Sequence, residues 1–142
     1  MNKLKAYGIA LYKHEDSTVK LLLCKSIRSD SKWGFLKGTV VRNDTTPKGT
    51  AQREFKEESG IFIHHHLLTK YFYQENEEKD IGIYLVDATK LDYIFKYFKG
   101  DKLLAKYICD ENEQVRFFDI NSLPKFKKNQ KEILKQILDS IQ

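Results

Sequence analysis

Three glutamates in one short segment have the residue type and spacing that metal chemistry requires. Glu54, Glu57 and Glu58 stand at positions i, i+3 and i+4, so on a helix all three side chains project from one face. Like charges at this spacing destabilise a helix by roughly a few tenths of a kcal/mol per pair, and coordination of a hard divalent cation such as Mg²⁺ would relieve the repulsion. Arg53, next to Glu54, is placed to orient one carboxylate by a bidentate pair. A solvated acidic helix is the alternative interpretation.

The segment 47–59 carries the signals of the helix that these glutamates need. Pro47 suits a first turn, Thr46 is expected to cap it, and Gly60 is expected to end it. The side of this helix that faces the core is expected to be formed by two apolar residues four positions apart, Ala51 and Phe55.

Hydrophobic periodicity predicts the elements around this helix. Strands are expected at 4–13, 18–25, 61–73, 80–88, 102–109 and 115–118. Further helices are expected at 91–98 and 126–141. Strands outnumber helices and do not alternate with them one for one, which favours an α+β domain with a mixed sheet and helices on its faces. A length of 142 residues suits one domain.

The composition narrows the class of protein. A net charge of +5, from 25 Lys and Arg against 20 Asp and Glu, permits an anionic partner without naming it. Cys24 and Cys109 are too few for a disulfide framework and are expected to be reduced, half-buried thiols on strands. No stretch approaches the roughly 18 apolar residues of a membrane span, and the N-terminus lacks the apolar segment of a signal peptide. We therefore expect a soluble cytoplasmic protein with no membrane partner.

The segment 38–61, GTVVRNDTTPKGTAQREFKEESGI, resembles the Nudix box, G-x5-E-x7-R-E-U-x-E-E-x-G-U, where U is a bulky aliphatic residue. Its second half, residues 53–61, matches this pattern. In its first half the loop has one extra residue, and either Asp44 or Thr45 stands at the upstream glutamate position. The preceding residues 33–38, WGFLKG, are similar to the family's W-G-F-P-K-G run.

This resemblance implies a single Nudix hydrolase domain over residues 1–142, folded as an α/β/α sandwich with a central mixed sheet. Nudix enzymes hydrolyse a nucleoside diphosphate linked to another group X and need Mg²⁺ or Mn²⁺. Glu54 or Glu57 would also position the attacking water, and Arg53 would orient a glutamate. The metal-binding set that the resemblance implies is the backbone carbonyl of Lys37 with the carboxylates of Glu54, Glu57 and Glu58.

A general base in some members of the family is a glutamate from a late loop. Glu111 and Glu113 are the candidates here, because they precede the strand expected at 115–118. A solvated acidic turn is the alternative interpretation of both residues.

Substrate contacts are expected from the loop around Trp33. The basic residues that flank this ring are candidates for phosphate contacts, with ordinary surface charge as the alternative: Arg28, Lys32 and Lys37. Tyr84 and Tyr73 are candidates for stacking on a base, with core packing as the alternative.

The run His64, His65 and His66 invites interpretation as a metal site. The run lies in a predicted strand, where successive side chains point to opposite faces and cannot converge on one ion. We therefore expect a structural or surface role for these histidines.

The resemblance to the Nudix box does not indicate which substrate is hydrolysed. The small size, the 33–38 run and the segment 111–123 are similar to small dinucleoside polyphosphate hydrolases, so a dinucleoside polyphosphate or another nucleotide is the expected substrate. An RNA 5′ end, by pyrophosphohydrolase or decapping activity, is the alternative, and the basic segment 125–135 is either an RNA contact or a solvated helix face. The altered first half of the box leaves a third interpretation, a catalytically weakened Nudix-fold nucleotide-binding module. The retained glutamates argue against that third interpretation, and the oligomeric state stays open.

Overall fold

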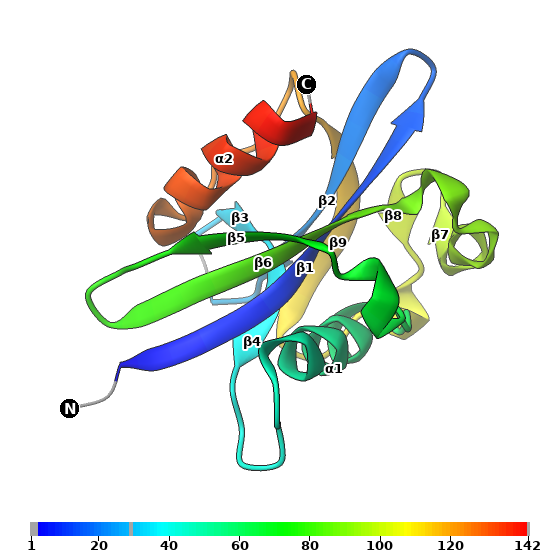
Figure 1. Cartoon of the computed structure of the whole chain (residues 1–142). Coiled ribbons are helices and arrows are strands. Elements are labelled where there is room, and N and C mark those ends of the chain that lie inside the picture. Colours follow the sequence, from blue (N-terminus) through cyan, green and yellow to red (C-terminus); the bar gives the residue numbers. More distant parts are fainter. Residues whose placement is uncertain (1–2, 29, 142) are drawn as a thin grey trace.

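A mixed β-sheet with one α-helix on each face organises the chain (Figure 1). The computed structural model describes residues 3–28 and 30–141. Within them, nine strands form one sheet, in the order β5-β6-β1-β2-β9-β8-β7, with β3 paired to β2 and β4 paired to β1. The strands are β1 (Leu4–Glu15), β2 (Thr18–Ser26), β3 (Trp33–Gly34), β4 (Leu36–Thr39), β5 (Lys70–Gln74), β6 (Lys79–Asp87), β7 (Phe98–Lys99), β8 (Lys102–Leu103) and β9 (Asn112–Asp119). The α-helices are α1 (Pro47–Ser59) and α2 (Lys131–Ile141).

The sheet is mixed because β1 runs parallel to β6, whereas the other paired strands run antiparallel. The β1–β6 pairing extends from Leu4 opposite Lys79 to Tyr12 opposite Asp87. The α+β sandwich with a central mixed sheet that the sequence predicts is confirmed.

The sheet forks between β1 and β2. These strands pair only near their connecting turn, from Tyr12 opposite Leu21 to Glu15 opposite Thr18. Beyond that point β4 takes the place beside β1 and β3 takes the place beside β2. The fork therefore brings the start of the glutamate-bearing segment into the middle of the sheet.

Two apolar cores lie on the two faces of the sheet. Each strand contributes side chains to both cores, because successive side chains point to opposite faces. Along β1, Ile9 and Leu11 enter the core under α1, and Ala10 enters the core under α2. Phe55 anchors α1 and Ile137 anchors α2, each with no exposed surface. Burial of this kind contributes about 1.5–3 kcal/mol for each large apolar side chain.

Four predicted elements need correction. Strand 61–73 is a strand only over Lys70–Gln74, and a 3₁₀ turn at His65–Leu67 precedes it, although Ile61 and Ile63 still point into the core. Strand 102–109 is a strand only at β8, because the chain then turns through 3₁₀ residues Ala105–Tyr107. In the first segment the apolar spacing reports burial correctly, whereas the apolar residues of 104–109 are only half-buried or exposed. Both segments pair with a neighbouring strand over only part of their length.

The predicted helix 91–98 is a 3₁₀ segment, Asp92–Tyr97, followed by β7. The predicted helix 126–141 becomes α-helical only at Lys131. Before it, Phe126 bridges Trp33 and residues Lys128–Gln130 form a 3₁₀ turn. The pairing of Phe126 with the sheet thus delays the start of α2.

The two cysteines are free, as expected, but not both as placed by the sequence. Cys24 lies on β2 and is buried rather than half-buried, and burial raises the pKa of its thiol. Cys109 is half-buried and lies outside the strands. In the part of the chain that the structure describes, no helix has the length and apolar character needed to cross a membrane.

Candidate active site

A pocket of about 610 Å³ opens where α1, β4 and the turn before β9 meet. Its wall combines carboxylates with lysines and buried polar groups. It is lined by Cys24, Ser26, Phe35, Lys37, Gly38, Thr39, Val41, Glu54, Glu57, Glu58, Lys79, Cys109, Asp110, Glu111, Asn112 and Lys127. All three glutamates of the predicted acidic face therefore line a single pocket.

The helix that presents these glutamates is fixed at both ends as the sequence predicts. Thr46 Oγ1 accepts a hydrogen bond from the Gly49 N–H at 3.0 Å. Gly60 ends the helix in the left-handed region at φ +78°, and its N–H donates to the Lys56 carbonyl at 2.8 Å. Phe55 fills the core below, and the adjoining side of α1, which carries the glutamates, is turned toward the pocket.

Arg53 gathers the carboxylates of this segment around one guanidinium. Its Nε and Nη2 donate to the two oxygens of Asp44, each at 2.9 Å. Its Nη1 donates to Glu54 Oε1 at 2.8 Å and to Glu57 Oε2 at 2.7 Å. Arg53 thus orients two pocket glutamates directly, and Asp44 in turn orients Arg53.

The upstream box position belongs to Asp44 rather than Thr45. The hydrogen bonds from Arg53 lower the pKa of the Asp44 carboxyl to about 2. The Val41 N–H donates to Asp44 Oδ2 at 2.9 Å, so a tight turn in the loop before α1 holds this carboxylate in place. The extra residue is therefore accommodated in the loop without loss of the carboxylate–arginine pair.

Gly38 makes room for Glu54. A Cβ at position 38 would overlap the Glu54 carboxylate, so only glycine lets the strand and this side chain approach so closely. Burial raises the pKa of Glu54 despite the hydrogen bond from Arg53. The glycine that opens the box thus has a direct packing reason.

Glu58 is the buried member of the acidic set. Its Oε1 accepts a hydrogen bond from Asn112 Nδ2 at 3.0 Å, and its Oε2 is buried with no hydrogen-bond partner. Burial raises its pKa to about 7. An unsatisfied buried carboxylate oxygen costs folding free energy, so this atom has the character of a ligand-binding group.

Three lysines line the same pocket as the glutamates: Lys37, Lys79 and Lys127. Burial lowers the pKa of Lys37, and the positive charges of Lys79 and Lys127 lower it further. Sequence reasoning found Lys37 but missed the other two. They come from the start of β6 and the segment before α2, and the sequence has no local signal that brings these segments together.

The other predicted charged residues are divided among different places. Glu111 lines the pocket, whereas Glu113 is exposed and pairs with Lys25 at 3.5 Å. Arg28 lines a neighbouring hollow of about 360 Å³ that it shares with Glu111. Lys32 lines a different pocket of about 830 Å³. The structure thus brings Lys37 and Glu111 to the glutamates and leaves the other three outside their pocket.

The aromatic candidates lie outside the pocket. Trp33 is buried and packs edge-on against Phe118, with ring centroids 4.7 Å apart. Tyr84 is buried in the core under α1 and packs against Tyr71. The Tyr73 hydroxyl donates to Asp80 at 2.9 Å. All three side chains are thus engaged in contacts within the protein. For the two tyrosines this agrees with the alternative interpretation, core packing, more than with stacking on a base.

The histidine run is not part of a strand, so the argument from strand geometry does not apply. His65 and His66 are in the 3₁₀ turn, and the rings of His64 and His66 pack 5.4 Å apart. Among the described residues, no group of three or more His, Cys, Asp and Glu side chains is preformed as a metal cluster. In the glutamate pocket, Arg53 holds one oxygen each of Glu54 and Glu57.

A family comparison agrees with the box and the fold. The NUDIX domain model matches residues 3–137. The chain belongs to the Nudix family. It is accordingly a Nudix pyrophosphohydrolase, an enzyme of the class that hydrolyses pyrophosphate bonds in nucleotide-linked substrates. Among curated proteins, no match to the chain was found.

Solved structures share this Nudix fold at low sequence identity. The NUDIX domain of Shewanella oneidensis NrtR, complexed with ADP ribose, superposes with a TM-score of 0.70 at 12% identity, covering 100% of this chain and 90% of that one. A MutT NUDIX hydrolase from Burkholderia pseudomallei gives 0.65 at 21% identity, with 96% and 99% covered. The Ap4A hydrolase of C. elegans in a binary complex gives 0.60 at 19% identity, with 83% and 81% covered.

Proposed function

We propose that this Nudix enzyme hydrolyses the pyrophosphate bond of a nucleoside diphosphate linked to a group X, in a reaction that depends on a divalent cation. The observation that carries the proposal is one pocket lined both by Glu54, Glu57 and Glu58 and by three lysines. Carboxylates supply cation ligands and lysines supply phosphate contacts, so one pocket holds both parts of a metal–polyphosphate site.

The donor set fits Mg²⁺ or Mn²⁺. Every proposed ligand is an oxygen: the carboxylates of the three glutamates and the backbone carbonyl of Lys37. The buried Oε2 of Glu58 has no other partner, and Arg53 leaves a second oxygen on both Glu54 and Glu57. When bound, the cation would neutralise phosphate charge and make a coordinated water more acidic.

The chain's own residues take the remaining roles. Arg53 is a positioning residue that holds Glu54 and Glu57, and Asp44 holds Arg53. Glu111 is the proposed general base, because it lines the same pocket as the glutamates and its alternative, Glu113, does not. It would accept a proton from the attacking water.

A dinucleoside polyphosphate or another nucleotide is the proposed substrate class. The Ap4A hydrolase of C. elegans shares this fold, which is consistent with such a substrate. The lysines of the pocket suit the negative charge of a polyphosphate chain. An RNA 5′ end remains an outcome of the substrate test, and so does binding without turnover. The cytoplasmic location and the single domain over residues 1–142 stay predictions.

The experiment compares Glu57→Gln with wild type on diadenosine tetraphosphate, ADP-ribose, a nucleoside triphosphate and 5′-triphosphorylated RNA in Mg²⁺. We expect kcat to fall about a hundredfold or more on whichever substrate is turned over, because a metal ligand and water-positioning group is lost. Since the Glu57 side chain is 54% exposed, the variant should keep the wild-type melting temperature.

Glu132→Gln is the matched control, because it makes the same chemical change on an exposed residue of α2 that does not line this pocket. Its kcat should equal that of wild type. Turnover of Glu57→Gln at the wild-type rate would refute the assignment of this glutamate. Tight binding of a substrate by wild type without turnover of any of the four would favour the binding-module alternative.

A further inference from the structure

A second pocket of about 830 Å³ adjoins the glutamate pocket and shares Lys79 and Lys127 with it. Its walls come from the β5–β6 turn, the segment before α2, the start of β1 and the end of the loop before β3. It is lined by Leu4, Lys32, Asn76, Glu77, Glu78, Lys79, Lys127, Lys128 and Asn129. We call it the lysine pocket. Because two lysines line both pockets, an extended anion bound at one can continue into the other.

The walls of the lysine pocket are tied together by Asn76. Its Nδ2 donates to the Lys79 carbonyl and to the Asn129 carbonyl, each at 3.0 Å, so it joins the β5–β6 turn to the segment before α2. Its Oδ1 accepts from Gln74 Nε2 at 2.9 Å. Buried Gln74 in turn accepts from the Ile133 N–H of α2 at 2.9 Å. These bonds form the pocket without any ligand, which limits the ordering cost of binding.

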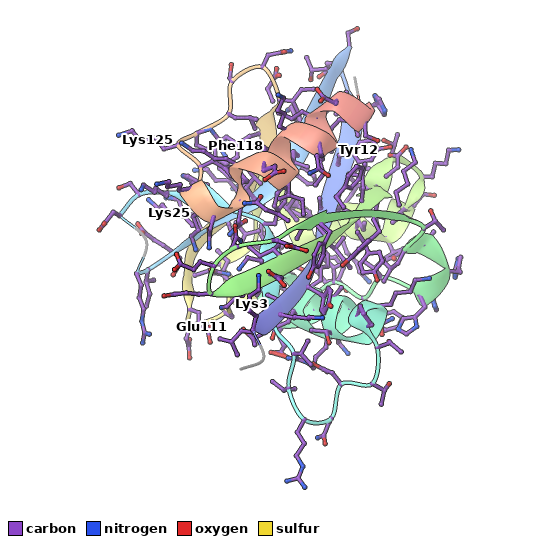
Figure 2. The ribbon with its side chains drawn as sticks, turned by 60° about the vertical axis from the view of Figure 1, so that its left-hand side comes forward. Lys3, Tyr12, Lys25, Glu111, Phe118 and Lys125 are labelled. Atoms are coloured by element: carbon purple, nitrogen blue, oxygen red, sulfur yellow. The ribbon has the colours of Figure 1, made fainter. Side chains whose placement is uncertain are left out.

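Lys3 also holds the β5–β6 turn in place. Lys3 Nζ donates to the Asn76 carbonyl at 2.8 Å and to Asp80 Oδ1 at 2.9 Å. Figure 2 shows Lys3 beside the first residues of β1 and near the β6 ribbon. Lys3 thus fixes this turn and does not itself line the pocket.

The lining favours phosphate over a nucleobase. Even with Lys32 left aside, three lysines, Lys79, Lys127 and Lys128, outnumber two acidic residues, Glu77 and Glu78. Among the residues described as lining the pocket, none is aromatic, so it offers no ring on which a base could stack. Lysine ammonium groups on flexible stems bind phosphate as point charges without demanding one geometry.

We propose that the lysine pocket is a phosphate subsite for group X, so that the enzyme favours substrates in which X itself carries phosphate. The inference rests on the proposed hydrolysis in the glutamate pocket and assigns the part of the substrate beyond the cleaved bond. A chain of phosphates would run from the glutamate side past Lys79 and Lys127 to Lys128. A substrate whose X is a neutral sugar gains nothing from this subsite.

The first test is calorimetric titration of inorganic tripolyphosphate into metal-free protein. Lys128→Glu is the variant, because Lys128 is exposed and lines the lysine pocket but not the glutamate pocket. Reversal of one charge at the subsite should weaken binding about tenfold, and the loss should shrink in high salt. Lys125→Glu is the matched control. Lys125 lines neither pocket and projects outward from the same segment (Figure 2), so it should bind tripolyphosphate within about twofold of wild type.

The second test is kinetic and separates the sources of phosphate. In Lys128→Glu, KM should rise for diadenosine tetraphosphate or for 5′-triphosphorylated RNA, whichever supplies the phosphates, while KM for ADP-ribose stays unchanged. Equal weakening of tripolyphosphate binding by Lys125→Glu and Lys128→Glu would overturn the subsite, as would an equal rise in KM for ADP-ribose. A protein that turns over none of these substrates would contradict the proposed function, and the calorimetric comparison would still decide the subsite.

Discussion

At the scale of single residues, Arg53 explains how the chain tolerates its acidic cluster. One guanidinium binds Asp44, Glu54 and Glu57, so charges that would repel one another share a cation. Glu58 lies outside this arrangement, because its carboxylate turns to Asn112 and the pocket interior. Arg53 therefore partly neutralises Glu54 and Glu57, whereas one oxygen of Glu58 has no hydrogen-bond partner in the pocket where a cation is proposed.

Asp44→Asn tests the pair that holds Arg53. Because the folded-state pKa of Asp44, about 2, lies below the value of roughly 3.9 in unfolded chains, the pair stabilises the protein at neutral pH. That stability is fully present above about pH 4 and is lost as the pH falls toward 2. The variant should lose about 1 kcal/mol of unfolding free energy at pH 7 and almost none at pH 2.

The measurement is urea unfolding of wild type and Asp44→Asn across that pH range, with kcat measured at pH 7. Loss of the orienting carboxylate should lower kcat about tenfold, since Arg53 is then free to move away from the glutamates. A difference in unfolding free energy that stays constant from pH 7 to pH 2 would show that the Asp44 charge is not its source.

At the scale of elements, the site depends on how β4 meets α1. Gly38 on β4 lies against the carboxylate of Glu54 on α1, and the loop between these elements carries Asp44 to Arg53. Both contacts join the same two elements. The strand, loop and helix therefore act as one unit, and the insertion in the loop leaves both contacts in place.

Gly38→Ala should separate packing from charge. The new methyl group overlaps the Glu54 carboxylate, so Glu54 must move or the strand must shift, at a cost of about 1–3 kcal/mol in unfolding free energy. We expect kcat to fall at least about tenfold, because the pocket glutamates lose their positions. Thermal unfolding and steady-state kinetics are the measurements.

Gly49→Ala is the control on the same helix. There the new methyl group would meet only the Thr46 hydroxyl, at 3.1 Å, and alanine favours helix over glycine. This variant should keep wild-type kcat, and its unfolding free energy should stay within about 1 kcal/mol of wild type. If Gly38→Ala also kept wild-type kcat, the close approach of β4 to Glu54 would have no bearing on catalysis.

At the scale of the whole molecule, two buried glutamines join the sheet to α2 and to the 3₁₀ turn that precedes it. Gln130 accepts a hydrogen bond from the Phe35 N–H at 2.8 Å, and its side chain fills the space beside Gly34. Gln74 accepts from the first turn of α2. Phe35, which lines the glutamate pocket, is therefore anchored to the 3₁₀ turn Lys128–Gln130, and the strand before the β5–β6 turn is anchored to α2, which follows directly.

The elements with strong local signals could be predicted from the sequence. Helix α1 has the predicted bounds because a cap, a proline and a terminal glycine all stand in its own sequence. The segments 61–69 and 104–109 could not be predicted in the same way. Apolar spacing indicates which residues can be buried, but strand pairing needs a neighbour that only the complete sheet supplies.

The site residues likewise fall into those with a local sequence signal and those without one. The glutamates and Arg53 are close together in sequence, so their spacing on one helix indicates their shared face. Lys79 and Lys127 are 48 positions apart and line one pocket only because the β5–β6 turn binds the segment before α2 through Asn76. Trp33 attracts attention in the sequence as a substrate contact, yet it packs on Phe118. Long-range hydrogen bonds and core packing decide these cases, and neither has a local pattern.

The central claim is that carboxylates of α1 hold a divalent cation that this chain needs to hydrolyse a pyrophosphate bond. The most direct measurement is product release from diadenosine tetraphosphate in Mg²⁺, after addition of a chelator, and after Mg²⁺ is restored in excess. The account predicts turnover that falls at least about a hundredfold with the chelator and returns with the metal. Turnover that continues unchanged in the chelator would contradict it.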